Sequence, residues 1–251
     1  MLVTRPEQQA GALCRLLEVQ GAVAHRLPAL SIVENPQRRE ILARLKSLPA
    51  FDLIIFISAN AVRHGVEILA QRRDLAIAAV GPATARALNQ AGFRVSVAAS
   101  EGFDSEHLLQ HPRLASLHGQ RVLLVKGSGG RELLEQQLAL RGAQVQTAAV
   151  YERRLATPAP GRLLELEQRF AAGEIHLITA TSLEIARHLF ALANGVLRDH
   201  FQRSQWVAPS ARVAQGIADL GVQEPVIQAV SAEDQELLNA VLRWRSTLSG
   251  A

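Results

Sequence analysis

The sequence predicts an α/β protein made of two similar, doubly wound domains, each with a parallel sheet of about five strands. Two observations predict this class: the chain contains an internal repeat, and within each copy short apolar runs alternate with amphipathic stretches that end in glycine. The composition agrees, because 48% of the 251 residues are hydrophobic and 20% are charged, which is too apolar for a disordered chain.

Three segments of the chain match later segments without gaps. Residues 1–22 align with 122–143 at an offset of 121, residues 53–62 with 176–185 at 123, and residues 79–92 with 208–221 at 129. Offsets that only increase are expected when one ancestral unit is duplicated and the second copy receives short loop insertions. In this alignment Ser58 corresponds to Thr181.

Strands and helices are predicted in turn along each copy. The apolar runs at residues 53–57, 77–80 and 122–125 are typical of buried strands. Leu13, Leu16 and Leu17 have helical spacing and give one apolar helix face. Glycines then stand where helices are expected to end, at Gly21, Gly92, Gly142 and Gly221. Strand, helix and glycine in alternation indicate helices on both faces of a parallel sheet.

Residues 28–34 and 148–154 occupy equivalent places between the copies. Both segments begin extended and pass into polar stretches that contain proline, so both are predicted to connect the two domains. The pattern leaves two arrangements open: each domain is one contiguous copy, or the first strand and helix complete the last domain.

Composition and charge exclude several classes of protein. The net charge is only +4, lysine occurs only at Lys46 and Lys126, the arginines are dispersed, and aromatic residues make up 4%. A nucleic-acid partner is therefore not expected. Cys14 is the only cysteine, and no apolar run is long enough for a secretory signal or a membrane span. We expect a cytoplasmic protein.

Small polar or cationic residues follow the predicted strands in both copies. The segments are Thr4–Pro6, Ser58–Asn60, Gly81–Thr84, Lys126–Arg131, Thr181–Ser182 and Pro209–Arg212. In open parallel sheets ligands bind at the carboxyl ends of strands, where helix N-termini attract anions. Ser, Thr and Asn are also the usual N-cap residues of helices, so any one of these turns taken alone is explained by a cap. The series as a whole predicts an anion-binding cleft between the domains.

Other chemistries find little support. The glycines of Gly127–Gly130 lack the Gly-Lys-Ser/Thr of a phosphate loop, and Glu132 stands where a dinucleotide fingerprint needs its third glycine. His107 and His111 have no cysteine or carboxylate partners in a pattern, so no metal site is predicted. Tyr151, the only tyrosine, is either a half-buried strand aromatic or a phenol that faces the cleft.

A series of motifs, spread over essentially the whole chain, resembles the uroporphyrinogen-III synthase family. The motifs are Leu2–Pro6, Phe56–Val62, Val80–Leu88, Ser105–Leu109, Gly119–Leu124, Arg131–Leu134 and Val150–Arg153. Two positions depart from the family pattern: Ile57 stands where threonine is common, and Ala208–Ser210 replaces a fuller Gly-Pro-x-Thr form.

The resemblance implies two flavodoxin- or Rossmann-like domains joined by two connector strands. One domain would comprise residues 1–29 and 157–251, the other 37–147, with 30–36 and 148–156 as connectors. It also implies a cofactor-free lyase of porphyrin (tetrapyrrole, heme) biosynthesis that cyclises hydroxymethylbilane to uroporphyrinogen III, inverting ring D and losing water. The enzyme would receive its substrate from hydroxymethylbilane synthase, and we expect a monomer.

By the same resemblance Tyr151 assists departure of the substrate hydroxyl as a hydrogen-bond donor. The residues expected to bind substrate are Arg5, Ser58, Asn60, Gly81, Thr84, Lys126, Gly127, Arg131, Thr181, Ser182 and Ser210, of which the three cations are chosen on electrostatic grounds. Two alternatives stay open: a non-catalytic two-lobed module that binds an anionic small molecule, and, with less support, a pair of sugar- or nucleotide-binding domains.

Overall fold

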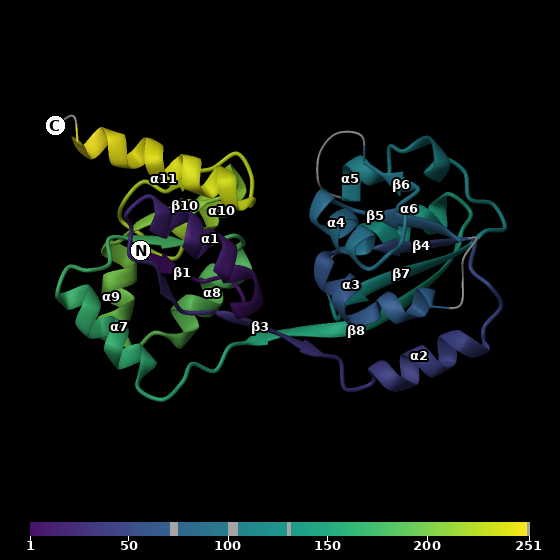
Figure 1. Ribbon diagram of the computed structural model, residues 1–251, viewed down its shortest axis with the longest axis horizontal. Helices are drawn as coiled ribbons and strands as arrows, with labels where there is room; N and C mark the ends of the chain where they lie inside the picture. Colours follow the sequence, from purple (N-terminus) through teal and green to yellow (C-terminus); the bar gives the residue numbers. More distant parts are fainter. Residues whose placement is uncertain (71–74, 100–104, 130–131, 250–251) are drawn as a thin grey trace. The chain divides into compact units, whose positions relative to one another are not determined.

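The computed structural model describes residues 1–70, 75–99, 105–129 and 132–249 (Figure 1). The chain divides into two compact units. Unit 1 comprises Met1–Ser31 and Arg154–Ala251, and unit 2 comprises Ile32–Arg153. Both ends of the chain therefore belong to unit 1, and unit 2 is a single continuous segment.

Unit 1 has a five-stranded sheet in the order β11-β10-β9-β1-β2, and the neighbouring strands run parallel. Its elements along the chain are β1 (Leu2–Val3), α1 (Glu7–Val19), β2 (His25–Arg26), α7 (Arg162–Ala171), β9 (Leu177–Thr179), α8 (Leu183–Leu192), α9 (Gly195–Arg203), β10 (Gln205–Ala208), α10 (Ala211–Ala218), β11 (Ile227–Gln228) and α11 (Asp234–Ser249). Strand β1, from the start of the chain, lies inside this sheet.

Unit 2 has a six-stranded sheet in the order β3-β8-β7-β4-β5-β6, and β4 to β8 pair in parallel. Its elements are β3 (Leu30–Glu34), α2 (Arg38–Ser47), β4 (Leu53–Phe56), α3 (Ala59–Gly65), η1 (Val66–Leu69), β5 (Ala76–Ala79), α4 (Pro82–Gln90), β6 (Val97–Ala98), α5 (Ser105–Leu108), η2 (Pro112–Leu114), β7 (Arg121–Gly127), α6 (Leu133–Leu140) and β8 (Gln144–Leu155). The connector predicted at 148–156 is largely the second half of β8, because strand pairing with β7 begins at Gln144.

The two sheets place equivalent strands in the same order, which supports the duplication. Reading β2-β1-β9-β10-β11 in unit 1 against β8-β7-β4-β5-β6 in unit 2 pairs β1 with β7, β9 with β4 and β10 with β5, as the sequence matches do. Helices α1 and α6 end 121 residues apart, at Val19 and Leu140, and Gly21 and Gly142 follow both with positive φ, 79° and 89°. Glycine adopts this left-handed conformation without a Cβ clash, so both helices stop where the sequence predicts.

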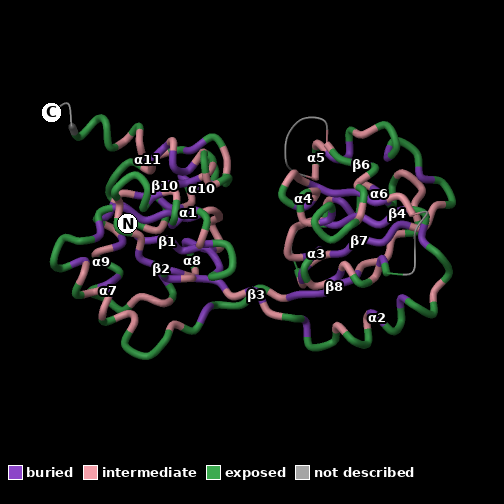
Figure 2. Tube along the Cα trace, viewed as in Figure 1, coloured by how far each residue is buried: buried purple, intermediate pink, exposed green. Residues whose placement is uncertain are grey.

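Alternate strand residues face opposite sides of each sheet, and each side is covered by helices. In unit 1, Val207 packs with residues of α1 and α11, while its neighbour Trp206 stacks on Phe190 of α8 with ring centroids 5.8 Å apart. Figure 2 shows the strands of both units as the buried parts of the chain and the helices with exposed outer faces. The predicted fold class is confirmed.

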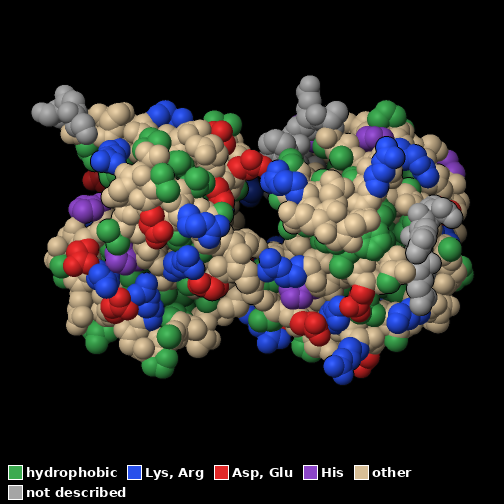
Figure 3. All heavy atoms as spheres, in the orientation of Figure 1, with side chains coloured by type: hydrophobic (Ala, Val, Ile, Leu, Met, Phe, Trp, Pro, Cys, Tyr) green, Lys and Arg blue, Asp and Glu red, His purple; other side chains and the backbone are tan. Residues whose placement is uncertain are grey.

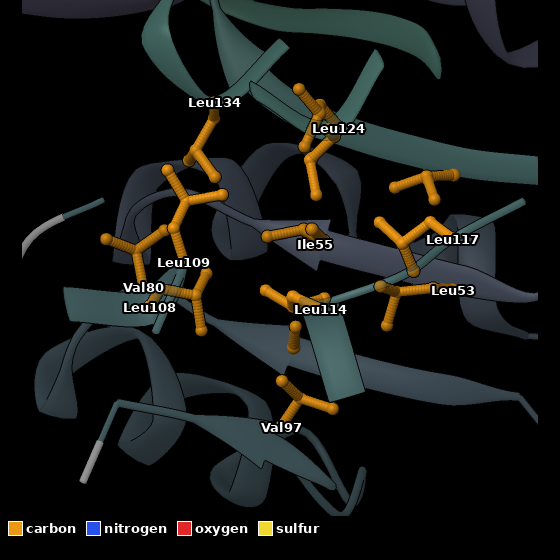
Figure 4. Packing of buried hydrophobic residues seen from close by; sticks show 13 residues of the cluster. Leu53, Ile55, Val80, Val97, Leu108, Leu109, Leu114, Leu117, Leu124 and Leu134 are labelled. Carbon is orange, nitrogen blue, oxygen red and sulfur yellow. The ribbon is translucent and has the colours of Figure 1, made fainter. Parts of the chain in front are cut away.

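In unit 2 the core lies between the sheet and helices α5 and α6. Leu53 and Ile55 of β4, Leu124 of β7 and Leu134 of α6 belong to one cluster there, all nearly inaccessible to solvent (Figure 4). On the opposite face Gly65 of α3 approaches β7 and β8 so closely that an added Cβ would lie 2.8 Å from Val125. Helix α3 therefore rests on the strands that carry the candidate site.

Candidate functional site

In unit 2 the predicted polar residues lie at one edge of the sheet. Strands β4, β5 and β7 are parallel, so their carboxyl ends share this edge. Ser58 follows β4, Gly81 follows β5, and Lys126 and Gly127 end β7. Ligands of open parallel sheets bind at such an edge because the helix N-termini present free backbone N–H groups there.

Ser58 and Tyr151 are in direct contact. The Ser58 Oγ lies 3.1 Å from the Tyr151 hydroxyl, and Ser58 also accepts a hydrogen bond of 3.0 Å from the Ala61 backbone N–H as the N-cap of α3. Since the Oγ has two lone pairs and one proton, it serves the helix and the phenol together. Two residues that the sequence analysis selected separately are thus brought together.

The Tyr151 ring packs on Gly127. Only 3% of Tyr151 is exposed, and a Cβ on Gly127 would lie 2.6 Å from two carbons of the ring. A glycine at this position is required because any side chain would displace the ring. The ring is a buried strand aromatic, more buried than expected, and its hydroxyl contacts Ser58. That the phenol faces the cleft stays a prediction.

His64, which the sequence analysis did not select, lies beside this contact. Its ring centroid is 5.9 Å from that of Tyr151. Burial, followed by the nearby cation of Arg63, lowers the pKa of His64, so the imidazole is neutral at pH 7. Its only signal in the sequence is its place shortly after Ser58 on the same helix, which is too weak to single it out.

The remaining unit 2 candidates that the structure describes end the same strands, follow them or lie in the helices after them. Gly81 is the N-cap of α4, and its carbonyl accepts from the Thr84 N–H at 3.0 Å. Thr84 is 4% exposed. Asn60 and Lys126 are half-buried. Arg131 lies outside the described residues.

In unit 1 the guanidinium of Arg5 is already engaged. It forms an ion pair with Asp234, donates to the Ala232 carbonyl, and is 8% exposed. Its Nε has no hydrogen-bond partner among the described residues. The charge that was expected to attract an anion is therefore largely balanced by Asp234, and a substrate-binding role for Arg5 stays a prediction.

The hydroxyls of unit 1 lie at helix N-termini. Ser182 caps α8 by accepting from the Ile185 N–H at 3.2 Å, and Ser210 caps α10 by accepting from the Val213 N–H at 3.4 Å. Thr181 precedes the first cap and is half-buried. The pairing of Ser58 with Thr181 in the repeat is wrong by one residue, because the N-cap equivalent to Ser58 is Ser182.

These arrangements offer hydrogen-bond donors, helix N-termini and one buried phenol, the chemistry suited to an anionic ligand. In the described part of the chain no three His, Cys, Asp or Glu residues are grouped as metal ligands, and no helix there has the length and apolarity to cross a membrane. On the face shown in Figure 3, Lys and Arg side chains are interspersed with Asp and Glu.

The sequence of this chain is similar to those of known proteins. The family model described as uroporphyrinogen-III synthase HemD matches residues 11–238. The uroporphyrinogen-III synthase of Salmonella typhimurium is 31% identical over 248 residues, covering 96% of this chain and 99% of the relative. That of Escherichia coli is 30% identical over 247 residues, with coverage of 96% and 99%.

Two solved structures support the fold. A mutant uroporphyrinogen III synthase from Thermus thermophilus has a TM-score of 0.64 at 22% identity, covering 100% of this chain and 99% of that one. The Helicobacter pylori uroporphyrinogen-III synthetase has a TM-score of 0.58 at 17% identity, covering 88% and 93%. With the matches in sequence, they lead to one conclusion: the chain belongs to the uroporphyrinogen-III synthase family.

Proposed function

We propose that the chain is a lyase that closes linear hydroxymethylbilane to uroporphyrinogen III, with inversion of ring D and loss of one water molecule. The observation that carries the proposal is the contact of the Tyr151 hydroxyl with Ser58 at the carboxyl edge of the unit 2 sheet, 3.1 Å apart. Membership of the family supports the reaction. The Tyr151 hydroxyl supplies a hydrogen-bond donor for the hydroxyl that leaves the substrate.

The chemistry needs orientation more than a strong acid or base. The terminal hydroxyl of the substrate leaves as water, which produces an electrophilic azafulvene. The linear tetrapyrrole then closes to the macrocycle through a spiro intermediate at the last ring. One molecule of substrate gives one molecule of uroporphyrinogen III and one molecule of water, so the reaction needs no oxidant or reductant. Because uncatalysed closure gives the non-inverted isomer, the enzyme acts by holding the substrate in the productive shape.

Tyr151 donates a hydrogen bond to the departing hydroxyl in this proposal. The packing of the buried ring on Gly127 fixes the direction of the phenol. His64 beside the ring is neutral at pH 7, so it adds no positive charge next to the phenol. Ser58 accepts from or donates to the phenol while the substrate is absent.

The carboxylates of the substrate are bound by the predicted polar groups. In unit 2 these are Ser58, Asn60, Gly81, Thr84, Lys126, Gly127 and Arg131, and in unit 1 they are Arg5, Thr181, Ser182 and Ser210. The positions of Ser58, Ser182 and Ser210 as N-caps support this assignment, because an anion there also meets the N-terminus of a helix.

We also propose the boundaries of the two domains, the compartment in which the protein acts and its oligomeric state. The domains are residues 1–29 with 157–251, and 37–147, joined by 30–36 and 148–156; the division of contacts after Ser31 and Arg153 falls within both connectors and supports this. We expect a cytoplasmic monomer that receives hydroxymethylbilane from hydroxymethylbilane synthase. The buried, free thiol of Cys14 supports a reducing compartment.

A coupled assay tests the function. Porphobilinogen and hydroxymethylbilane synthase generate the substrate in place, and the oxidised products are separated into isomers I and III. Isomer III should dominate when the chain is present, and isomer I when it is omitted. A product dominated by isomer I in both reactions, with tight binding of uroporphyrinogen, would instead identify the chain as a non-catalytic binding module.

A further inference from the structure

The pairing of β7 with β8 is irregular immediately before Tyr151. Lys126 pairs with Ala149, but the next pair is Gly127 with Tyr151, so Val150 is an extra residue in β8. Such a β-bulge changes the direction of the side chains that follow it, and bulges are frequent beside active sites for that reason. The direction of the Tyr151 phenol therefore depends on this bulge.

Asn35, which follows β3, forms hydrogen bonds to the bulge from the side of β8 opposite β7. Its backbone N–H donates to the Val150 carbonyl at 3.2 Å, and its side-chain amide donates to the neighbouring Ala149 carbonyl at 2.8 Å. In a regular strand two consecutive carbonyls point to opposite sides. Asn35 binds both here, one with its backbone N–H and the other with its side-chain amide.

The same side chain reaches the turn that carries Gly127. The Asn35 amide also donates to the Ser128 Oγ at 3.2 Å, and the Ser128 N–H donates to the Tyr151 carbonyl at 2.8 Å. The Asn35 Oδ1 accepts from the Gln37 N–H at 2.8 Å, which leaves the amide in a single orientation. Asn35 is 6% exposed, so these bonds form out of contact with solvent, where an unmade bond is costly.

We propose that Asn35 is a positioning residue for the reaction. By binding the Ala149 and Val150 carbonyls and the Ser128 hydroxyl, it fixes the strand that carries Tyr151 relative to the end of β7 on which the ring packs, and so aims the phenol at the departing hydroxyl of the substrate. The inference rests on the proposed function for its catalytic part, but the placement of Tyr151 by Asn35 is measurable without any substrate.

Tyr151 is the only tyrosine, so protein that incorporates meta-fluorotyrosine has a fluorine NMR spectrum that reports this residue alone. Asn35→Ala should shift and broaden that spectrum, and should lower kcat by roughly tenfold or more while KM changes little. Asn35→Asp keeps the size of the side chain and the acceptor for Gln37 but has no amide donor. Asn35→Asp should show the same change in the fluorine spectrum and the same fall in kcat. It serves as the test variant if Asn35→Ala does not fold.

Asn194→Ala is the matched control. Asn194 caps α9 by accepting from the Leu197 N–H at 2.9 Å and donates to Glu167, and it lies in unit 1. Its loss should leave the fluorine spectrum and kcat unchanged. A folded Asn35 variant with the wild-type spectrum and wild-type kcat would overturn the proposal. If the wild-type chain forms no uroporphyrinogen III, the proposed function fails, and the fluorine spectrum alone then decides whether Asn35 places Tyr151.

Discussion

At the scale of single residues, the site depends on three groups that each have two tasks. Ser58 caps α3 and contacts the phenol, Gly127 ends β7 and supports the ring, and Tyr151 fills a buried position while its hydroxyl contacts Ser58. A substitution at any of them changes structure and chemistry together. Experiments must therefore separate the two effects.

Tyr151→Phe separates them best, because the ring and its packing on Gly127 are kept. We expect kcat to fall about a hundredfold, since the donor to the departing hydroxyl is lost. The free energy of unfolding should fall by only about 1 kcal/mol, the contribution of one hydrogen bond. Initial rates in the coupled assay and urea unfolding measure the two. A variant with the wild-type rate would remove the phenol from the mechanism.

Gly127→Ala tests the support of the ring. The new Cβ would overlap the Tyr151 ring carbons, so we expect a loss of about 1–3 kcal/mol in unfolding free energy together with a loss of activity. Gly195→Ala is the control. Gly195 begins α9, and a Cβ added there would have no atom within 4 Å, so this variant should stay within about 0.5 kcal/mol of wild type. Equal stability of the two variants would contradict the close packing.

Residue types at strand ends indicate Ser58 and Gly127, and the family resemblance indicates Tyr151, but neither signal says which of these residues meet. Ser58 and Tyr151 are 93 positions apart, and Asn35 and Ser128 are also 93 apart. Such pairs depend on strand order and on the bulge at Val150, neither of which leaves a local pattern in the sequence. The ion pair of Arg5 with Asp234, 229 positions away, was missed for the same reason.

At the scale of helices and strands, the N-caps raise the question of whether Ser182 serves only α8 or also the substrate. Aspartate and asparagine both cap helices as well as serine does, so Ser182→Asp and Ser182→Asn should keep the unfolding free energy within about 0.5 kcal/mol. Only the aspartate adds a negative charge, which should raise KM for the anionic substrate several-fold relative to the asparagine variant. Identical KM values would assign Ser182 to capping alone.

The repeat predicted the elements well wherever helices and strands matched in length. The offset of 129 pairs β5 with β10 at both ends and Gly81 with Ser210, the N-caps of α4 and α10. It failed by one residue at Thr181, because Ile54 lies beside Leu123 and Ile178 lies beside Leu2, the repeat partner of Leu123, which gives an offset of 124 here and pairs Ser58 with Ser182. Apolar patterning does not fix the offset between two buried strands to the residue.

At the scale of the whole molecule, buried histidines make stability depend on pH. His25 in unit 1 is 9% exposed, and its Nε2 has no hydrogen-bond partner in the described part of the chain. Burial, then the N-terminal amine, Arg169 and Arg162, lower its pKa, and burial lowers the pKa of His64 in unit 2. Each unit thus contains at least one histidine whose pKa is lowered in the folded chain.

The sign of the effect follows from linkage. Below pH about 6.5 the unfolded chain binds protons at these histidines that the folded chain does not, so the free energy of unfolding falls as pH is lowered, by at most about 1.4 kcal/mol per pH unit for each histidine. Urea unfolding measured at several pH values below about 6.5 should show this fall in the free energy of unfolding. His25→Gln should reduce the slope of the unfolding free energy against pH. His176→Gln, at an exposed histidine, is the control and should leave the slope unchanged.

The place of β1 inside the unit 1 sheet has a consequence for biosynthesis. Leu2 and Val3 are translated before unit 2, yet β9, their neighbour in the sheet, is translated only after all of unit 2. Unit 2, a continuous segment, is complete while β1 still lacks that partner. A message cut short before β9 therefore yields a chain in which β1 can pair only with β2.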